Sequence, residues 1–142
     1  MTDNIRITAH DAPSPDDAVR VANGLADHVA MRFGPRDERA FSIFAHDAYD
    51  TLVGGVNGST HWRWLYIRNL WIAETWRNRG LGRRLIDAAE HLARERNCTG
   101  LYLDTFDQDA ERFYRRCGFE TFGRIDNFPP GHARRFLSRS MI

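Results

Sequence analysis

The sequence predicts an α/β (α+β) chain in which helices flank a mixed, mostly antiparallel central sheet of about six to seven strands. Short runs of alternating or branched apolar residues recur along the chain, and segments between them carry apolar residues at helical spacing. The 142 residues, 42% hydrophobic and 27% charged, are typical of one globular domain, here residues 1–142. A strand–helix–strand step over residues 62–106 predicts one parallel pair with a right-handed crossover.

The first third of the chain predicts one strand, one helix and then a hairpin. IRIT, residues 5–8, alternates like a short strand. Residues 13–33 read as a helix that Ser14 or Asp16 can cap and that ends at Gly34-Pro35. Its apolar stripe consists of Val19, Ala22, Leu25, Ala26 and Val29. Residues 40–46 and 51–58 bracket "DAYD" and predict an antiparallel hairpin, with a bulge or a close backbone approach at Gly54-Gly55.

The remaining chain predicts four strands and two helices. Residues 62–73 form a long strand rich in aromatic and branched residues, with a bulge near residues 69–71. Leu81, Leu85, Ala88 and Leu92 give the stripe of an amphipathic helix that ends near Asn97. A strand at 100–106 precedes a short helix that Asp107 or Asp109 caps and that ends with a left-handed Gly118. Strands at 120–125 and 133–142 close the chain.

Composition excludes several classes of protein. The two cysteines, Cys98 and Cys117, fit neither a disulfide framework nor a zinc site, so we expect buried thiols and no metal. We see neither a membrane span nor a signal peptide, and therefore expect a cytoplasmic location and no membrane partner. Residues 1–60 carry five arginines against nine acids, and residues 61–142 carry fifteen against ten. An anionic partner should therefore bind the second half.

The segment TWRNRGLGRRL, residues 75–85, is the strongest candidate for an anion site. A glycine-containing turn between a strand and a helix presents free N–H groups and the positive end of the helix dipole. A P-loop requires lysine, and this chain contains none. A dinucleotide fingerprint requires a third glycine where Leu85 stands, and too little chain remains for a second nucleotide-binding half. The pattern left is Arg77-x-x-Gly80-x-Gly82.

This pattern resembles the acyl-CoA pyrophosphate loop of the GNAT superfamily of N-acetyltransferases, Gln/Arg-x-x-Gly-x-Gly/Ala. A second segment, DQDAERFYRRCGFE, resembles the later family element Asn-x-x-Ala-x-x-Phe/Leu-Tyr-x-x-x-Gly-Phe, except that Asp107 replaces Asn. The resemblance covers the chain from about Ala40 onward. The LDTF and PPGH elements look like those of a bacterial subgroup.

The resemblance implies a GNAT-like fold that binds acetyl-CoA as co-substrate. The strand near Trp71 and Ile72 would splay from residues 101–105, and its free backbone groups would bind the pantetheine arm and polarise the acetyl carbonyl. Backbone N–H groups of residues 79–83 would hold the pyrophosphate, and arginines 77, 79, 83 and 84 would attract it. The implied cofactor-binding set is Trp71, Ile72, Arg77, Asn78, Arg79, Gly80, Leu81, Gly82, Arg83, Asp107, Ala110 and Phe113.

The resemblance also implies catalytic roles. Tyr114 matches the tyrosine that protonates the departing thiolate, although its spacing also suits a core aromatic residue. Asp104 at the end of its strand, His132 in the PPGH loop and a water molecule are the candidates for the general base, and the sequence does not choose among them. The acceptor amine would bind between the first helix, residues 59–64 and residues 126–132, near Trp62, Trp64, Asp126 and Phe128.

Two other functions stay open. The first is a GNAT-type toxin that acetylates aminoacyl-tRNA, for which Arg112, Arg115, Arg116, Arg134 and Arg135 would have to form a basic surface. The net charge of only +1 argues against nucleic acid as a partner. The second is a module without catalysis that binds acyl-CoA or nucleic acid. The resemblance is compatible with a homodimer, and the sequence leaves both the oligomeric state and the acceptor open.

Overall fold

The structure is a computed structural model that describes residues 4–12 and 14–142. Its contacts divide the chain into two units, residues 1–36 and 37–142. The first unit holds one helix, α1 (Pro15–Phe33), which begins after Ser14 with proline at its first position and ends at Gly34 with φ of +83°. Residues 5–8 form no strand, contrary to the prediction, because none of the described strands pairs with them.

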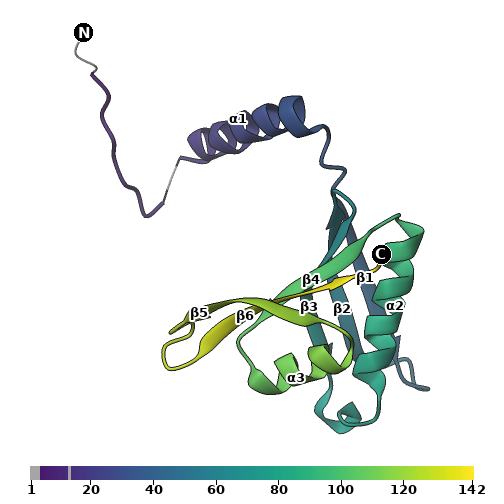
Figure 1. Cartoon of the computed structure of the whole chain (residues 1–142). Helices are drawn as coiled ribbons and strands as arrows, with labels where there is room; N and C mark the ends of the chain where they lie inside the picture. Colours follow the sequence, from purple (N-terminus) through teal and green to yellow (C-terminus); the bar gives the residue numbers. More distant parts are fainter. Residues whose placement is uncertain (1–3, 13) are drawn as a thin grey trace. The chain divides into compact units, whose positions relative to one another are not determined.

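The second unit is built on one six-stranded sheet with the strand order β1-β2-β3-β4-β6-β5 (Figure 1). All neighbouring strands are antiparallel except β3 and β4, as the strand–helix–strand step predicts. The strands are β1 (Arg39–His46), β2 (Leu52–His61), β3 (Trp64–Ile72), β4 (Gly100–Thr105), β5 (Glu120–Asp126) and β6 (Ala133–Ser140). The mixed sheet and its flanking helices confirm the predicted fold class.

Two α-helices, α2 (Leu81–Glu95) and α3 (Gln108–Arg116), cover one face of the sheet. Arg139 and Arg135 lie four residues apart on β6 and therefore point to the same side; they bond to Glu90 of α2 and Glu111 of α3, respectively. A short 3₁₀ helix, η1 (Glu74–Trp76), joins β3 to the turn before α2. The core under α2 contains the fully buried side chains Leu65, Ile86, Ala89, Ala93, Leu101 and Leu137.

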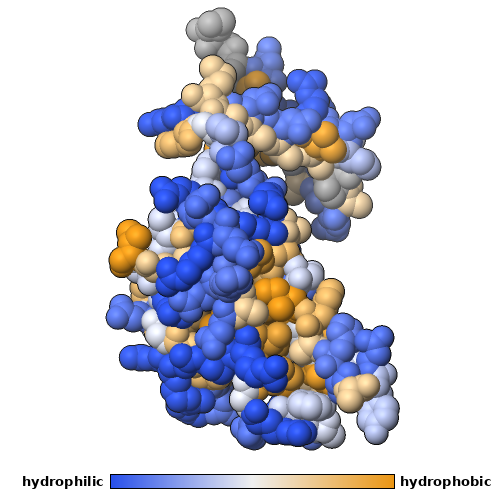
Figure 2. All heavy atoms as spheres, turned by 90° about the vertical axis from the view of Figure 1, so that its right-hand side faces the viewer, coloured by the Kyte–Doolittle hydropathy of each residue, from blue (hydrophilic) through white to orange (hydrophobic). Residues whose placement is uncertain are grey.

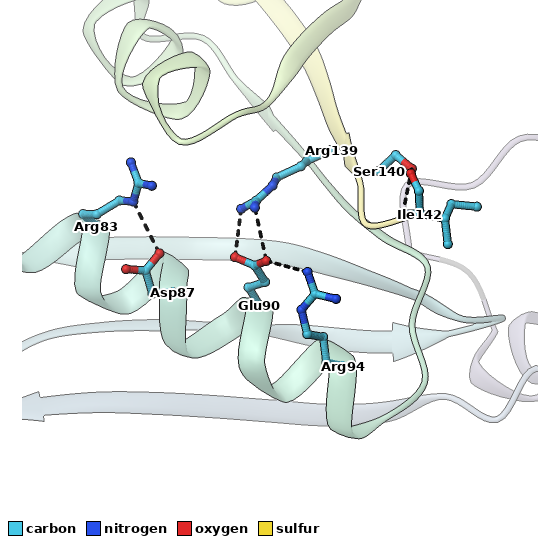
Figure 3. Close-up of polar contacts among 7 residues, drawn as sticks. All are labelled: Arg83, Asp87, Glu90, Arg94, Arg139, Ser140 and Ile142. Carbon is cyan, nitrogen blue, oxygen red and sulfur yellow. Dashed lines mark hydrogen bonds and ion pairs between the residues drawn. The ribbon is translucent and has the colours of Figure 1, made fainter.

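Glu90 ties α2 to β6 by a three-residue ion-pair cluster (Figure 3). Its carboxylate accepts from Arg94 one turn along the helix at 2.9 Å and from Arg139 of β6 at 3.0 and 3.1 Å. The pair between Glu90 and Arg94 follows from their spacing of four residues along α2, and β6 adds a second arginine that this spacing does not reveal.

The pairing of β3 with β4 is short, and this shapes the site. It runs from Trp64–Gly100 to Tyr66–Tyr102 only, so the strands part after Tyr66, as the splayed pair requires. On its other side β3 pairs with β2, with Arg68 as an extra residue between the pairs Asn57–Asn69 and Gly58–Ile67. The predicted bulge is thus confirmed, but it lies just before residues 69–71.

Other predicted boundaries shift by a few residues. The strand expected to end at Gly58 continues to His61, and a two-residue turn at Trp62-Arg63 with positive φ values of 44° and 66° leads into β3. Gly54 is needed for close approach, because a Cβ there would lie 3.1 Å from the carbonyl oxygen of Trp71. Gly118 has φ of +93° after α3, as predicted.

Candidate functional site

The turn before α2 has the geometry expected of an anion site. Asn78 and Gly80 adopt positive φ values of 59° and 82°, and the helix begins at Leu81. The first N–H groups of an α-helix have no acceptor within the helix, so those of Leu81, Gly82 and Arg83 point out of its N-terminus. They add to the positive end of the helix dipole at this place.

Gly82 lies where three elements meet. A Cβ at this position would lie 3.0 Å from Cδ1 of Ile72, at the end of β3, and 3.0 Å from Cζ of Phe113 in α3. A larger side chain would therefore have to displace the ends of the Ile72 and Phe113 side chains. Leu81 and Gly82 are buried, whereas Trp71 is about half exposed at 50%. The site residues predicted on β3, α2 and α3 are brought together at this junction.

Most arginines of the turn have partners within the chain. Arg77 donates from Nε to the carbonyl of Ile72 at 3.2 Å, and the guanidinium of Arg79 lies 4.1 Å over the ring of Trp76. Arg83 donates to Asp87 at 3.3 Å (Figure 3) and to the carbonyl of Arg116 at 3.3 Å. Arg84 is exposed and makes no side-chain contact in the described part of the chain. Arg77, Arg79 and Arg84 thus have no carboxylate partner among the described contacts.

The surface on the α2 side of the chain is mainly hydrophilic, with hydrophobic residues exposed next to it (Figure 2). The charged residues Arg83, Arg84, Asp87, Arg94 and Glu95 are the exposed ones of α2 that account for this character. The turn before α2 thus lies at one end of a helix with one charged, exposed face and another face packed on the sheet.

Asp107 caps α3. Its Oδ1 accepts from the backbone N–H groups of Asp109 at 2.8 Å and Ala110 at 3.4 Å, which confirms one of the two predicted caps. The family resemblance also implies a contact between this carboxylate and the pantetheine arm, but Oδ1 is already used within the helix. Ala110 and Phe113 pack against the core, on the same helix as Tyr114.

Tyr114 is buried, with 7% of its surface exposed. Its ring packs against Phe113 and Phe119, at centroid distances of 5.3 and 5.8 Å. Burial, with a small contribution from Cys117, raises the pKa of Tyr114 to about 12, because the charged phenolate is poorly solvated there. The phenol therefore carries its proton throughout the neutral and moderately alkaline range.

Asp104 belongs to a polar cluster at the point where β3 and β4 part. Its Oδ1 accepts from the hydroxyl of Tyr66 at 3.4 Å, and its Oδ2 accepts from Nη1 of Arg134 at 3.3 Å. Burial and the charge of Asp104 raise the pKa of Tyr66. Arg134 lies between the rings of Phe128, at 3.9 Å, and Phe106, at 5.3 Å. Its Nε is buried without a hydrogen-bond partner in the described residues.

Sequence reasoning missed Tyr66, and it considered Arg134 only for an RNA-binding surface and not as a partner of Asp104. Both side chains lie on the face of the sheet opposite the helices, as Asp104 does. Alternation along a strand shows which of its residues share a face, but not which of the two faces that is. What sequence does not reveal is that β4 lies between β3 and β6, which brings the three together.

The residues predicted around the acceptor line two separate grooves. Trp62 and Trp64 line one of about 390 Å³, with His61, Tyr102, Phe122 and Ser138. Asp126 and His132 line another of about 890 Å³ between the start of α3 and the β5–β6 hairpin, with Arg135. His132 is exposed, and its backbone closes the hairpin loop through Phe128 and Pro129. The predicted acceptor positions are Trp62, Trp64, Asp126 and Phe128. Within this unit the first two line one groove, Asp126 lines the other and Phe128 lines neither, so they do not share one pocket.

The five arginines required for an RNA-binding surface do not act as one patch. Arg134 pairs with Asp104, the buried Arg135 pairs with Glu111 at 3.2 Å, and Arg112 pairs with Asp109. Only Arg115 and Arg116 on α3 are exposed without a carboxylate partner among the described contacts. This pairing reduces the positive charge available to a polyanion.

Cys98 and Cys117 are both buried free thiols, as predicted. Among the described residues, no three or more histidine, cysteine or acidic side chains form a group that could hold a metal ion. No helix in the described ranges is long and apolar enough to cross a bilayer.

Comparison with known sequences identifies relatives over most of the chain. The model of the acetyltransferase (GNAT) family matches residues 5–119, and so spans both units. The chain is 35% identical over 119 residues to acetyltransferase Atu2258 of Agrobacterium fabrum, covering 84% of this chain and 87% of that protein. It is also 35% identical over 107 residues to blasticidin-S acetyltransferase of Streptomyces morookaense, covering 75% and 79%.

Solved structures show the same fold. An acetyltransferase from Agrobacterium tumefaciens superposes with a TM-score of 0.87 at 29% identity, over 96% of this chain and all of that one. A Bacillus anthracis protein assigned as a streptothricin acetyltransferase, solved in complex with acetyl coenzyme A, gives a TM-score of 0.66 at 23% identity over 76% of this chain and 64% of that one. At that identity the likeness supports the fold alone.

Proposed function

The chain belongs to the GNAT family of acetyltransferases, and on that premise we propose that it transfers the acetyl group of acetyl-CoA directly to a primary amine of a small molecule or peptide. The observation that carries the proposal is the junction at Gly82. There the N-terminus of α2, the end of β3 and the helix of Tyr114 lie in contact, so one bound thioester could reach all three.

The donor would bind along this junction. The N–H groups of residues 79–83 would hold the pyrophosphate, and Arg84 would add a charge that no carboxylate of the described chain neutralises. Trp71 and Ile72 lie on the part of β3 that does not pair with β4. Backbone groups of this segment that face the opening rather than β2 are therefore available for the pantetheine amide and for the acetyl carbonyl, except the carbonyl of Ile72, which accepts from Arg77. The cap at Asp107 leaves this residue a structural role, beside Ala110 and Phe113.

Tyr114 would donate the proton that the departing thiolate needs. A phenol with a pKa of about 12 is always protonated at neutral pH, so the acid form is present. Its burial places the proton where water does not compete for the thiolate. The reaction then breaks the carbon–sulfur bond while the amine nitrogen forms the new amide bond.

The proton of the amine has a less direct path. Both carboxylate oxygens of Asp104 already have a partner within the chain, because one accepts from Tyr66 and the other from Arg134. We therefore assign it to binding and orienting the amine, and a water molecule at Asp104 would take the proton. The exposed His132 would be the alternative base.

The test is an acetyl-CoA turnover screen with the purified chain. The acceptors are polyamines, amino acids, aminoglycosides, blasticidin S, peptides and charged tRNA, with CoA release and the acetylated product both measured. We expect amine-dependent CoA release that falls at least about tenfold in Tyr114→Phe at every pH from 6 to 10. An unchanged kcat in Tyr114→Phe would contradict the role of this phenol.

Other outcomes identify the competing functions. Binding of acetyl-CoA by calorimetry without acetylation of any acceptor would indicate a non-catalytic module. Acetylation of charged tRNA alone, with growth arrest on expression, would indicate a toxin. The paired arginines described above do not favour the latter.

We further propose a cytoplasmic bacterial protein, because acetyl-CoA is a cytoplasmic metabolite and the two sequence relatives come from Agrobacterium and Streptomyces. We also propose a homodimer. α1 buries none of its residues and carries exposed aliphatic side chains, among them Val19 and Leu25, that a second copy could cover. Light scattering during size-exclusion chromatography measures the mass that decides this.

A further inference from the structure

The face of the sheet opposite α2 and α3 carries a continuous row of aromatic side chains. Trp64 and Tyr66 alternate with the buried residues of β3, and Tyr102 does the same on β4. Ring centroids lie 6.3 Å apart between Trp64 and Tyr102 and 5.0 Å apart between Tyr66 and Tyr102. The row ends at Asp104, which accepts from the hydroxyl of Tyr66. The row of aromatic side chains thus runs along the sheet from the point where β3 and β4 part.

The other end of the row opens into the groove of about 390 Å³, which we call the aromatic groove. Its lining consists of His61, Trp62, Trp64, Tyr102, Phe122 and Ser138. Five of these six side chains are rings, and the lining includes neither arginine nor carboxylate. A groove of this volume and composition fits one small ring system better than a charged chain.

The ring of Trp64 packs against a glycine. A Cβ on Gly100 would lie 2.4 Å from Cζ3 and 2.6 Å from Cη2 of Trp64, so the indole lies directly against the backbone of β4. A ring packed in this way presents a flat wall to a bound molecule. Stacking on such a wall favours a flat partner over a puckered one of equal size.

The charges near the row disfavour a polycationic ligand. The guanidinium of Arg68 lies 5.7 Å from the ring of Tyr66, and Arg134 is bonded to Asp104. The two positive charges of Arg68 and Arg134 therefore lie near the single negative charge of Asp104. An acceptor with several ammonium groups would be repelled, whereas a single nitrogen could approach Asp104.

From these features we propose that the acceptor is an amine carried on a flat aromatic or heteroaromatic ring. This inference rests on the acetyl transfer proposed above. The ring would lie in the aromatic groove beside Trp64, and the nitrogen would lie at Asp104, where the strands part. Tyr102 and Asp104 are two residues apart on β4, which corresponds to about 7 Å, so ring and nitrogen should be separated by about that distance.

The small volume also argues against a polypeptide occupant. A helix that laid its apolar face on this sheet would need a long groove with anchors one turn apart, and the aromatic groove of about 390 Å³ has only six lining residues. A second copy of the chain on this face is therefore an outcome that the test must be able to detect.

The test uses the full chain with three probe amines: 4-phenylbutylamine (the phenyl amine), its saturated analogue 4-cyclohexylbutylamine (the cyclohexyl amine), and spermidine. We expect a KM about tenfold lower for the phenyl amine than for the cyclohexyl amine, and the weakest use of spermidine. Equal KM values for the two monoamines, or a preference for spermidine, would overturn the proposal.

Trp64→Leu tests the wall directly. It should raise the KM for the phenyl amine about tenfold and leave the kcat with that amine, the KM for acetyl-CoA and the KM for the cyclohexyl amine within about twofold. Phe44→Leu, which replaces an exposed aromatic residue of β1, is the matched control and should change none of these. An equal loss for both monoamines in Trp64→Leu, or a change in its molecular mass by light scattering, would contradict a ring site.

A measurement on the unmodified chain covers the case in which Trp64→Leu does not fold. The alcohol 4-phenylbutan-1-ol lacks the amine, and should inhibit competitively against the phenyl amine but not against acetyl-CoA; no inhibition would overturn the proposal. The two proposals fail differently. An enzyme that acetylates amines without preferring the ring disproves only the acceptor class, whereas calorimetric binding of the phenyl amine without acetylation upholds the ring site and disproves the transfer.

Discussion

At the scale of single residues, Gly82 connects the fold to the proposed donor site. Its backbone N–H belongs to the first turn of α2, and the absence of a side chain lets Ile72 and Phe113 come to van der Waals contact with the helix. A residue with a Cβ would separate elements that the acetyl donor must bridge. The same glycine therefore affects packing and the proposed binding at once.

Gly82→Val should weaken donor binding. The branched side chain would displace Ile72 and Phe113 and cost about 1–3 kcal/mol of stability through overpacking. We expect the KM for acetyl-CoA to rise at least about tenfold, measured by steady-state kinetics below the lowered melting temperature. Gly24→Ala is the control, because nothing lies within 4 Å of its added Cβ in α1, and it should keep the KM unchanged. A wild-type KM in Gly82→Val would contradict the placement of the donor.

Some site residues can be predicted from the sequence and others cannot, for a physical reason. Gly80, Gly82 and Tyr114 are part of local patterns, since a turn and one helix face are determined by residues close in the chain. Arg134 contacts Asp104 only because β6 pairs with β4, and such non-local pairing is not encoded in any short segment. Of the polar cluster at Asp104, the sequence therefore predicts one member only.

At the scale of elements, the sequence predicts the helices more accurately than the strand ends. α2 and α3 have apolar stripes, and Asp107 caps α3. The end of β2 at His61 is not predicted, because the turn at Trp62-Arg63 contains neither glycine nor proline. The strand expected at residues 5–8 does not form. Alternation of apolar residues indicates that a segment can pair in a sheet, but not that a partner strand is present.

The ion-pair cluster of Glu90 predicts how the contact between α2 and β6 depends on pH. Burial alone would raise the pKa of Glu90, but hydrogen bonds and charges from Arg94 and Arg139 outweigh it and lower the pKa. A carboxyl whose pKa is lower in the folded state stabilises that state above its unfolded pKa, and this contribution is lost as pH falls through the folded value. The cluster should therefore stabilise the protein at neutral pH and not in strong acid.

Glu90→Gln should lower the free energy of unfolding by about 1–2 kcal/mol at pH 7, measured by urea denaturation. The difference from the unmodified protein should shrink as the pH falls from about 4.5 downward, because the unmodified carboxyl then becomes neutral as well. Asp87→Asn removes a partner of the exposed Arg83 and serves as control, with an expected change of at most about 0.5 kcal/mol. A constant difference at every pH would contradict the role of the charge.

At the scale of the whole molecule, charge is distributed unevenly along the chain. Residues 1–60 carry a net charge of −4 and residues 61–142 carry +5. The second set contains the α2 turn with Arg77, Arg79, Arg83 and Arg84, where the phosphates of the donor would bind. Composition predicts this bias without any structure, but the ion pairs of Arg83, Arg134 and Arg135 show that part of it is neutralised locally. What remains at the turn should act at long range.

This remaining charge predicts a salt dependence of donor binding. Between about 50 and 500 mM NaCl the Debye length falls from roughly 14 to 4 Å, so exposed arginines lose most of their attraction for the phosphates. We expect the KM for acetyl-CoA to rise about three- to tenfold over this range while kcat stays within about twofold.

S-acetyl-N-acetylcysteamine, a thioester that carries the acetyl group without any phosphate, is the control donor, and its KM should not change with salt. Arg84→Gln should reduce the salt dependence for acetyl-CoA, because Arg84 has no carboxylate partner among the described contacts, whereas Arg94→Gln at the other end of α2 should retain it. A KM for acetyl-CoA that does not respond to salt, or that responds equally for both donors, would show that the arginines of the turn do not attract the nucleotide.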